Sequence, residues 1–290
     1  MSLERFLVTG ANGFVGFSIL KLLLKNNHNV VGCYFNKNNN LKSLQGYDNL
    51  TIDKIDITSK EDISQKILKY NPNRIINCAA YGILPSQADR LKMLEVNLTG
   101  TFNLIEALGQ SQEKRMIHFG SCFEYGSYKG KIKEANLEKP STFYGHTKLA
   151  ATRLALNMSM EFNLPIVVLR PFGLWGPNES IERLVPQIID ACINKKNLKL
   201  TLGEQLRDYT YIDDLADWAL KIINLKNFPN GEIFNLGSRS CKIREFAKEI
   251  ANEFDGEHFL RFGELPYRNN EMMELVANNS KLVSLIGNLK

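Results

Sequence analysis

The chain alternates short apolar runs with longer segments in which apolar residues recur at helical spacing. The apolar runs predict strands at residues 5–9, 29–35, 50–57, 74–79, 115–121 and 165–170. The periodic segments predict helices at residues 14–25, 59–70, 92–109 and 144–162. Strands that alternate with helices in this way indicate βαβ units, which right-handed crossovers join into a parallel sheet.

The regular alternation of predicted strands and helices ends at Pro171, because proline and glycine accumulate between positions 171 and 177. Downstream, the pattern predicts helices at 181–194, 212–223 and 242–254 and strands at 199–202 and 231–237. We therefore predict an α/β protein with two parts. Residues 1–172, with 208–237 returning to them, form a Rossmann-type doubly wound parallel sheet, and residues 173–207 and 238–290 form a smaller C-terminal α/β substrate lobe.

The composition is that of an ordinary globular protein, with 44% hydrophobic and 23% charged residues. The longest apolar runs are interrupted by lysine, and the N-terminus lacks the apolar segment of a secretory signal, so we expect a cytoplasmic protein without a membrane partner. The five cysteines show no CxxC spacing and no histidine partner, which argues against a metal site or a disulfide framework. The net charge of +5 is scattered, which favours an anionic small ligand over nucleic acid.

A glycine-rich turn follows the first predicted strand and opens the first predicted helix. Its glycines are Gly10, Gly13 and Gly16, in the segment GANGFVG. Glycine allows a tight turn and lets the backbone approach a pyrophosphate, whose negative charge then meets the N–H groups at the helix N-terminus. The position of the motif therefore predicts a dinucleotide-binding site.

The choice between NAD and NADP depends on the end of the second predicted strand, where an acidic residue would bind the ribose hydroxyls of NAD. This position falls at about Tyr34, followed by Asn36 and Lys37, and holds no acid. A lysine there suits a 2′-phosphate, so we predict NADP in preference to NAD. Asp56, at the end of the third predicted strand, has two interpretations: it contacts adenine, or it caps the next helix.

Tyr144 and Lys148 are four residues apart at the start of a predicted helix, so they share one face. A tyrosine with an ordinary pKa near 10 is a poor acid–base catalyst at neutral pH, and a neighbouring ammonium group is expected to favour its phenolate. Ser121 ends the fifth predicted strand, at the edge where open α/β sheets bind ligands, and its hydroxyl is suited to polarise a carbonyl group. These three residues are our predicted catalytic set.

Taken in order, the motifs resemble those of the extended short-chain dehydrogenase/reductases, the NAD(P)-dependent nucleotide-sugar epimerases, dehydratases and reductases. The resemblance runs nearly from end to end. It rests on the segments GANGFVG (10–16), KIDIT (54–58), NCAAYG (77–82), VNLTGT (96–101), GSCFEYG (120–126), YGHTK (144–148), RPFGLWGP (170–177), RDYTYIDDLA (207–216) and IFNLGS (233–238).

The resemblance implies a set of cofactor contacts. It places Asp56 at the adenine, Lys148 at the nicotinamide ribose and Pro171 near the nicotinamide ring. The predicted cofactor-binding residues are Gly10, Asn12, Gly13, Phe14, Val15, Gly16, Asn36, Lys37, Asp56, Ile57, Ala79, Ala80, Tyr144, Lys148 and Pro171.

The resemblance also implies how the substrate is held. Tyr144 would be the general acid/base, Ser121 its carbonyl-orienting partner, and Arg207 a contact to the diphosphate of a sugar nucleotide. Asn97 resembles the family's helix asparagine, to which we assign a structural role, and His146 is expected on the helix surface. The predicted substrate-binding residues are Ser121, Cys122, Phe123, Tyr144, Arg207 and Arg268.

Departures from the family pattern separate its reactions. Sugar dehydratases of the family carry Asp-Glu where this chain has Cys122 and Phe123, which argues against dehydration. Epimerases of the family carry the acidic ribose ligand that is missing at Tyr34. Gly173 stands where many relatives have an asparagine that contacts the substrate diphosphate. The missing acid at Tyr34 favours net reduction with NADP, and the GSCFEYG spelling and the short chain resemble bacterial nucleotide-sugar 4-ketoreductases, of the CDP-abequose synthase kind.

The leading hypothesis is therefore an NADP-dependent reductase of a nucleotide-linked 4-keto-6-deoxysugar. An NAD-dependent nucleotide-sugar 4-epimerase is the alternative within the family, and a non-catalytic dinucleotide-binding sensor or scaffold is the alternative from another class. The resemblance also implies a homodimer formed through residues 92–109 and 147–162.

Overall fold

A seven-stranded parallel sheet is the centre of the computed structural model, which describes residues 4–36, 40–44, 46–269 and 271–289. The spatial order of the strands is β11-β7-β5-β4-β1-β2-β3. Their bounds are β1 (Arg5–Thr9), β2 (Asn29–Tyr34), β3 (Leu50–Lys54), β4 (Arg74–Asn77), β5 (Arg115–Phe119), β7 (Ile166–Pro171) and β11 (Ile233–Leu236). The strand order reverses between β1 and β4, which is where doubly wound sheets bind ligands.

Helices cover both faces of this sheet, and each face has its own apolar core. On one face, α1 (Phe14–Lys25) packs beside α7 (Ile212–Ile223). On the other face, α4 (Gly100–Leu108) packs between α2 (Lys60–Tyr70) and α5 (Phe143–Glu161). The Rossmann-type doubly wound fold predicted from the sequence is confirmed. No helix in the described ranges is long and apolar enough to cross a membrane.

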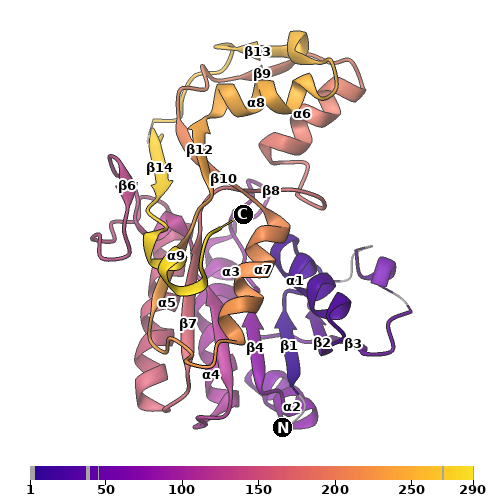
Figure 1. Cartoon of the computed structure of the whole chain (residues 1–290), viewed down its shortest axis with the longest axis vertical. Helices are drawn as coiled ribbons and strands as arrows, with labels where there is room; N and C mark the ends of the chain where they lie inside the picture. Colours follow the sequence, from indigo (N-terminus) through magenta and orange to yellow (C-terminus); the bar gives the residue numbers. More distant parts are fainter. Residues whose placement is uncertain (1–3, 37–39, 45, 270, 290) are drawn as a thin grey trace.

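A small lobe lies above the sheet in Figure 1. Its central strand is β10 (Leu206–Tyr211), which pairs antiparallel with β12 (Arg239–Lys242) and parallel with β14 (Glu274–Ala277) and β8 (Leu174–Trp175). The lobe also contains β6 (Lys131–Ile132), α6 (Leu184–Ile193), β9 (Leu198–Leu200), α8 (Ile243–Asn252), β13 (Leu260–Phe262) and a 3-10 turn at Glu257–Phe259. In contrast, α9 (Ser280–Ile286) packs against β11 and α7 of the main sheet, and further 3-10 turns lie at Asn40–Leu44 and Cys122–Glu124.

The helix predicted over residues 92–109 is divided in the structure. It begins as α3 (Arg90–Leu94), continues as a π-helical turn over Glu95–Thr99, and becomes α4. Asn97 lies in the π turn, and its side chain is fully buried. Such a turn widens the helix by one residue and commonly accompanies a functional position.

Candidate active site

A cavity of about 430 Å³ lies at the carboxyl edge of the main sheet, where residues that follow β1, β4, β5 and β7 come together. Most of the predicted site residues line it. They are Asn12, Gly13, Phe14, Val15, Gly16, Ala80, Ser121, Cys122, Phe123, Tyr144, Lys148 and Pro171. The structure therefore brings the glycine-rich turn and the three predicted catalytic residues to the walls of one cavity.

The glycine-rich turn is as tight as its sequence requires. Gly10 has a positive φ of 61°, and the Gly13 N–H donates to the Gly10 carbonyl oxygen at 2.9 Å. A Cβ atom on Gly16 would collide with the Gly10 carbonyl group, so glycine is required there for close packing. The turn leads directly into α1, whose first residues line the cavity. A bare backbone turn at a helix N-terminus fits a dinucleotide diphosphate.

Most of the residues predicted to bind the adenosine half of the cofactor do not line this cavity. The Asn12 side-chain amide donates to the Asn36 carbonyl oxygen at 2.5 Å, which ties the turn to the segment after β2. Asp56 accepts from the backbone N–H and the hydroxyl of Thr58, so its carboxylate closes a local turn, and Ser59 rather than Asp56 is the N-cap of α2. Gly10, Asn36, Asp56, Ile57 and Ala79 do not line the cavity, and Lys37 lies outside the described residues.

Ser121 begins the short 3-10 turn that follows β5. Its hydroxyl oxygen accepts from the Phe123 N–H at 3.2 Å, and its own N–H donates to the Glu124 carboxylate at 2.8 Å. This reciprocal capping box holds the Ser121 backbone in place. The Ser121 side chain also acts on the Tyr144 phenol, where it opposes the rise in the pKa of the phenol.

Tyr144 lies in the first turn of α5, whose N-cap is Thr142. Burial raises the pKa of the Tyr144 phenol well above its ordinary value. The expectation that Lys148 favours the phenolate is therefore wrong in this structure. The groups that act on the Tyr144 phenol besides burial are Ser121, Cys122, Glu124 and Arg183.

Lys148 is buried on the same helix, and only 2% of its surface is exposed. Burial lowers the pKa of its ammonium group to about 8, against the opposing influence of Glu124 and Cys78. Within the described part of the chain, its Nζ atom forms no ion pair shorter than 4.0 Å. The electrostatic partner of Lys148 is thus a carboxylate behind the cavity wall.

Glu124 is the centre of a buried polar network beneath Ser121, and the sequence analysis missed it. Its carboxylate accepts from the Ser121 N–H and from the Thr152 hydroxyl at 3.0 Å, and it pairs with Arg170 at 2.7 Å. Arg170 also pairs with Glu138 at 2.9 Å. The side chains of Glu124 and Arg170 are fully buried. The spacing S-x-x-E between Ser121 and Glu124 was the signal that could have revealed this capping box.

A loop after β8 contributes residues that the sequence analysis also missed. Asn178, Glu179, Ser180 and Arg183 line the cavity opposite Ser121 and Tyr144. The Arg183 guanidinium lies 3.4 Å from the Glu179 carboxylate. Burial raises the pKa of Glu179 to about 7, and Arg183 opposes this rise. Proline and glycine between positions 171 and 177 indicated a loop, but they did not indicate where it would lie.

The predicted diphosphate ligands lie apart from the cavity walls. Arg207 pairs with Glu271 at 2.9 Å and is mostly buried, whereas Arg268 is exposed. A side chain at position 173 would collide with the Asp208 carbonyl oxygen, because β10 approaches closely and the Thr210 N–H donates to the Gly173 carbonyl oxygen at 2.8 Å. Glycine at position 173 therefore allows this segment to pack closely against β10.

Two further residues near the catalytic pair have structural roles. Asn97 donates to the Thr147 hydroxyl and the Tyr81 carbonyl oxygen, and it accepts from the Tyr81 N–H. It thus ties α5 to the loop that follows β4. His146 is exposed on α5, and its ring bonds to the Thr142 carbonyl oxygen, in agreement with the expected surface position. Among the described residues, no three His, Cys, Asp or Glu side chains gather as a metal site.

This geometry can be compared with known proteins. A model of the NAD dependent epimerase/dehydratase family matches residues 6–237. The chain belongs to this family. Protein CapI of Staphylococcus aureus is 26% identical over 282 residues, which cover 87% of this chain and 84% of that protein. CDP-abequose synthase of Yersinia pseudotuberculosis is 27% identical and covers 93% of this chain and 90% of its own length.

The fold comparison agrees with the family. The crystal structure of UDP-glucuronic acid 4-epimerase from Bacillus cereus, in complex with UDP-glucuronic acid and NAD, has a TM-score of 0.89 and 27% identity to this chain. The similarity covers 98% of this chain and 93% of that one. Family membership confirms the prediction of an enzyme of the extended short-chain dehydrogenase/reductase type.

Proposed function

We propose that the enzyme uses NADPH to reduce the C4 carbonyl group of a nucleotide-linked 4-keto-6-deoxysugar. The observation that carries this proposal is the common cavity of the glycine-rich turn, Ser121, Tyr144 and Lys148. A cofactor bound at the turn and a sugar beside Tyr144 would then meet in one enclosed space. The similarity to CDP-abequose synthase supports the same assignment.

A bound reduced nicotinamide supplies the hydride for this reaction. Because burial keeps the Tyr144 phenol protonated at neutral pH, Tyr144 has a proton to donate to the alkoxide that develops on the sugar. Ser121 donates a hydrogen bond to the same oxygen and orients the carbonyl group. Lys148, with a pKa of about 8, is still mainly an ammonium group at neutral pH and is suited to bind ribose hydroxyls.

The residues after Ser121 argue against dehydration. Burial raises the pKa of the Cys122 thiol to about 12, so it is neither an acid nor a base at neutral pH. Phe123 carries no proton to transfer, and its ring packs edge-on against Tyr144 with 6.0 Å between the ring centroids. The two positions that supply the extra acid and base in dehydratases are therefore inert here.

NADP is proposed as the preferred cofactor because Tyr34, and not an acid, ends β2. NAD is the alternative, and the NAD-bound epimerase from Bacillus cereus supports it. The measurement is the ratio of kcat/KM for NADPH to that for NADH with one keto sugar. A ratio above ten is expected, and a ratio below one would reverse the assignment.

A 4-epimerase is the second candidate, which the similarity to UDP-glucuronic acid 4-epimerase favours. The two reactions are separated by two incubations of the enzyme, one with NADPH and nucleotide 4-keto-6-deoxysugars that differ in base, and one with NAD and nucleotide sugars that carry a hydroxyl group at C4. The proposal expects stoichiometric oxidation of NADPH and a reduced sugar. Inversion at C4 of an unreduced nucleotide sugar, without NADPH oxidation, would instead support the epimerase. Dinucleotide binding without turnover of any sugar nucleotide would support the non-catalytic alternative.

The proposed substrate carries a diphosphate, for which Arg183 and Arg207 are the candidate ligands. Arg183 already lines the catalytic cavity, while Arg207 is held by Glu271. Both are guanidinium groups, which bind phosphate oxygens through two parallel hydrogen bonds. We also propose that the enzyme acts in the cytoplasm as a homodimer, and that its two-part division falls at residue 172.

A further inference from the structure

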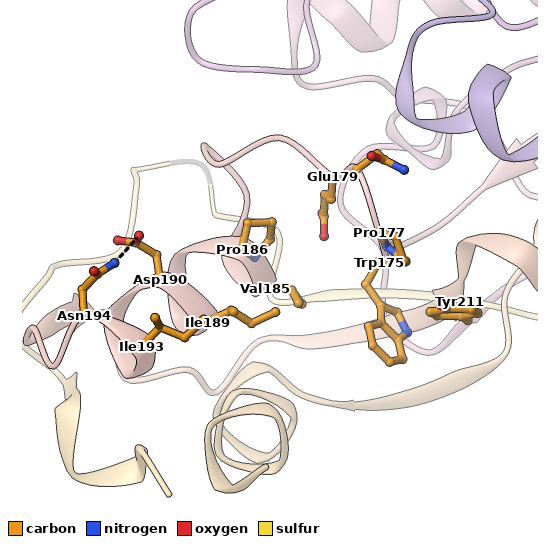
Figure 2. A pocket seen from close by; sticks show the side chains of 12 residues that line it. Trp175, Pro177, Glu179, Val185, Pro186, Ile189, Asp190, Ile193, Asn194 and Tyr211 are labelled. Atoms are coloured by element: carbon orange, nitrogen blue, oxygen red, sulfur yellow. Dashed lines mark hydrogen bonds between the residues drawn. The ribbon is translucent and has the colours of Figure 1, made fainter. Parts of the chain in front are cut away.

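A second cavity, of about 580 Å³, lies in the small lobe, on the other side of the loop that carries Glu179. One wall is the face of α6 that presents Val185, Ile189 and Ile193, and the opposite wall is formed by Trp175 and Tyr211 (Figure 2). A volume between about 300 and 1,000 Å³ is typical of small-molecule sites. The cavity is therefore large enough for a ligand of one or two rings.

The walls of this cavity are apolar and aromatic. The Trp175 and Tyr211 rings lie edge to face with centroids 5.0 Å apart, with Pro177 beside Trp175, and Pro186 belongs to the opposite wall on α6. These side chains give a flat ligand an apolar surface to bury. Electron-rich ring faces also attract a positive charge that lies within about 6 Å.

The charged groups of the cavity are all acidic. Of its lining residues, Glu179 and Asp190 carry carboxylates, and none is a lysine or an arginine, although the whole chain carries a net charge of +5. Asp190 at the rim accepts a hydrogen bond from Asn194 at 2.8 Å. Arg183, which pairs with Glu179 from outside the lining, offsets part of this negative charge, and Asp190 adds a second carboxylate at the rim.

Glu179 provides a specific polar anchor. Only 5% of its side chain is exposed, and its carboxylate points into the cavity between Pro186 and Trp175 (Figure 2). One oxygen lies 3.4 Å from Arg183, but the other, Oε2, is buried without a hydrogen-bond partner in the described part of the chain. A buried acceptor without a partner is unfavourable, so a hydrogen bond from a donor group of a ligand would stabilise the complex.

We propose that this cavity binds an aromatic cation, a ring that carries an amidinium or ammonium group, with its N–H donor on Oε2 of Glu179. The ring would lie against Trp175 and Tyr211, and the charge would be compensated by the carboxylate. This site shares Asn178 and Glu179 with the wall of the catalytic cavity, but the proposal does not rest on the reductase activity. An anionic sugar nucleotide is the wrong charge for it, and the candidate phosphate ligands Arg183 and Arg207 do not line it.

The test is isothermal titration calorimetry of the full chain with benzamidine and with benzamide, its neutral analogue of nearly the same shape. We expect benzamidine to bind at least tenfold more tightly than benzamide. Glu179→Gln, which keeps the shape but removes the charge, should weaken benzamidine binding at least tenfold. The control is Glu182→Gln, three residues away, whose carboxylate bonds to Ser86 outside the cavity and whose loss should leave the affinity unchanged.

Equal affinities for the two probes would overturn the proposal, and so would undiminished binding by folded Glu179→Gln. Absence of benzamidine binding at millimolar concentration would also overturn it. The comparison of the two probes on the unmodified chain does not depend on the folding of any variant. NADPH oxidation assays are not part of this test, so its failure and a failure of the reductase proposal remain distinct.

Discussion

Tyr144 and Lys148 lie one helical turn apart on α5, and burial shifts the pKa of each toward its neutral form. The phenol keeps its proton more firmly, and the ammonium group loses its proton more readily. A reductase needs a proton donor at the carbonyl oxygen, whereas oxidation needs a base there. A protonated Tyr144 therefore favours the reductive direction over the oxidative one. The protonated state is stabilised by the burial of the phenol and not by the neighbouring lysine.

Tyr144→Phe tests the role of the phenol directly. Removing a general acid lowers kcat by about 10²–10⁴-fold, while the ring still fills its place in the cavity wall. We expect this loss in NADPH oxidation with a keto sugar, and unchanged NADPH affinity measured by calorimetry. Activity within threefold of the unmodified enzyme would show that another group donates the proton.

Glu124→Gln tests whether the buried carboxylate sets the charge of Lys148. Glu124 raises the pKa of Lys148 against burial, so its neutralisation should move that pKa below about 8. An activity that requires the ammonium form is lost as the pH rises through this value, and the basic limb of the profile of kcat/KM should therefore move to lower pH. The amide oxygen of glutamine can still accept from the Ser121 N–H.

The control for this variant is Glu138→Gln, because Glu138 pairs with the same Arg170 but is not among the groups that act on Lys148. Its basic limb should remain in place. If the basic limbs of the pH profiles of kcat/KM coincide for the unmodified enzyme and Glu124→Gln, the role of Glu124 is structural only. Removing one partner of a buried ion pair costs about 3–5 kcal/mol, so both profiles are measured below the melting temperature of each variant.

Among the individual site residues, those at the ends of strands and at the N-termini of helices were predicted from the sequence. Ser121, Tyr144 and Lys148 all reach the cavity, because the pattern of a parallel sheet dictates where such positions meet. Glu179 and Arg183 could not be predicted in the same way. Their place opposite Tyr144 depends on the path of a loop across the sheet edge, which is set by long-range contacts and not by local spacing.

The π turn between α3 and α4 is the element that most directly supports the catalytic helix. Through Asn97 it makes three hydrogen bonds, to both backbone groups of Tyr81 and to the Thr147 hydroxyl, which lies between Tyr144 and Lys148 in the sequence. Periodicity alone predicted one continuous helix here, because a single inserted residue changes the apolar pattern very little.

Asn97→Ala should therefore destabilise the protein more than an ordinary asparagine substitution. It leaves the buried Tyr81 and Thr147 groups with fewer partners, at about 1–3 kcal/mol for each unsatisfied group. We expect the free energy of unfolding in urea to fall by about 3 kcal/mol. Asn26→Ala, at an exposed helix end, should change it by no more than about 0.5 kcal/mol. Equal effects of the two substitutions would contradict the support assigned to the π turn.

Element prediction succeeded where a segment was long enough to show its period. The strands of the main sheet and the helices that cover it were all predicted, with ends displaced by a few residues. The short strands β6, β8, β12, β13 and β14 were not predicted, since two to four residues carry too little alternation to separate a strand from a loop. The six-residue strand β10 was not predicted either, because Arg207, Asp208 and Thr210 interrupt its apolar pattern. The pairing of these strands with one another, and of β13 with β9, forms the lobe.

At the scale of the whole molecule, the apolar surface indicates how two copies would associate. Leu91 and Leu94 on α3 are 71% and 39% exposed, and Phe143, at the start of α5, is 37% exposed. These side chains lie on adjoining elements, since α3 packs against α5. The family resemblance predicts a dimer through residues 92–109 and 147–162, which include Leu94 and adjoin Leu91 and Phe143. Burial of such side chains would contribute about 25 cal/mol per Å² of apolar surface.

Leu94→Glu should then dissociate the predicted homodimer, because it places a carboxylate in an apolar contact. The measurement is the mass in solution by light scattering, with a shift from two chains to one expected at micromolar concentration. Leu68→Glu is the matched control, since Leu68 is 84% exposed on α2, which α4 separates from α5, and its replacement should leave the mass unchanged. A monomeric unmodified chain, or a dimer that survives Leu94→Glu, would exclude the predicted interface. Because Tyr144 lies on α5 immediately after Phe143, monomers that also lose activity would indicate that dimerisation stabilises the first turn of the catalytic helix.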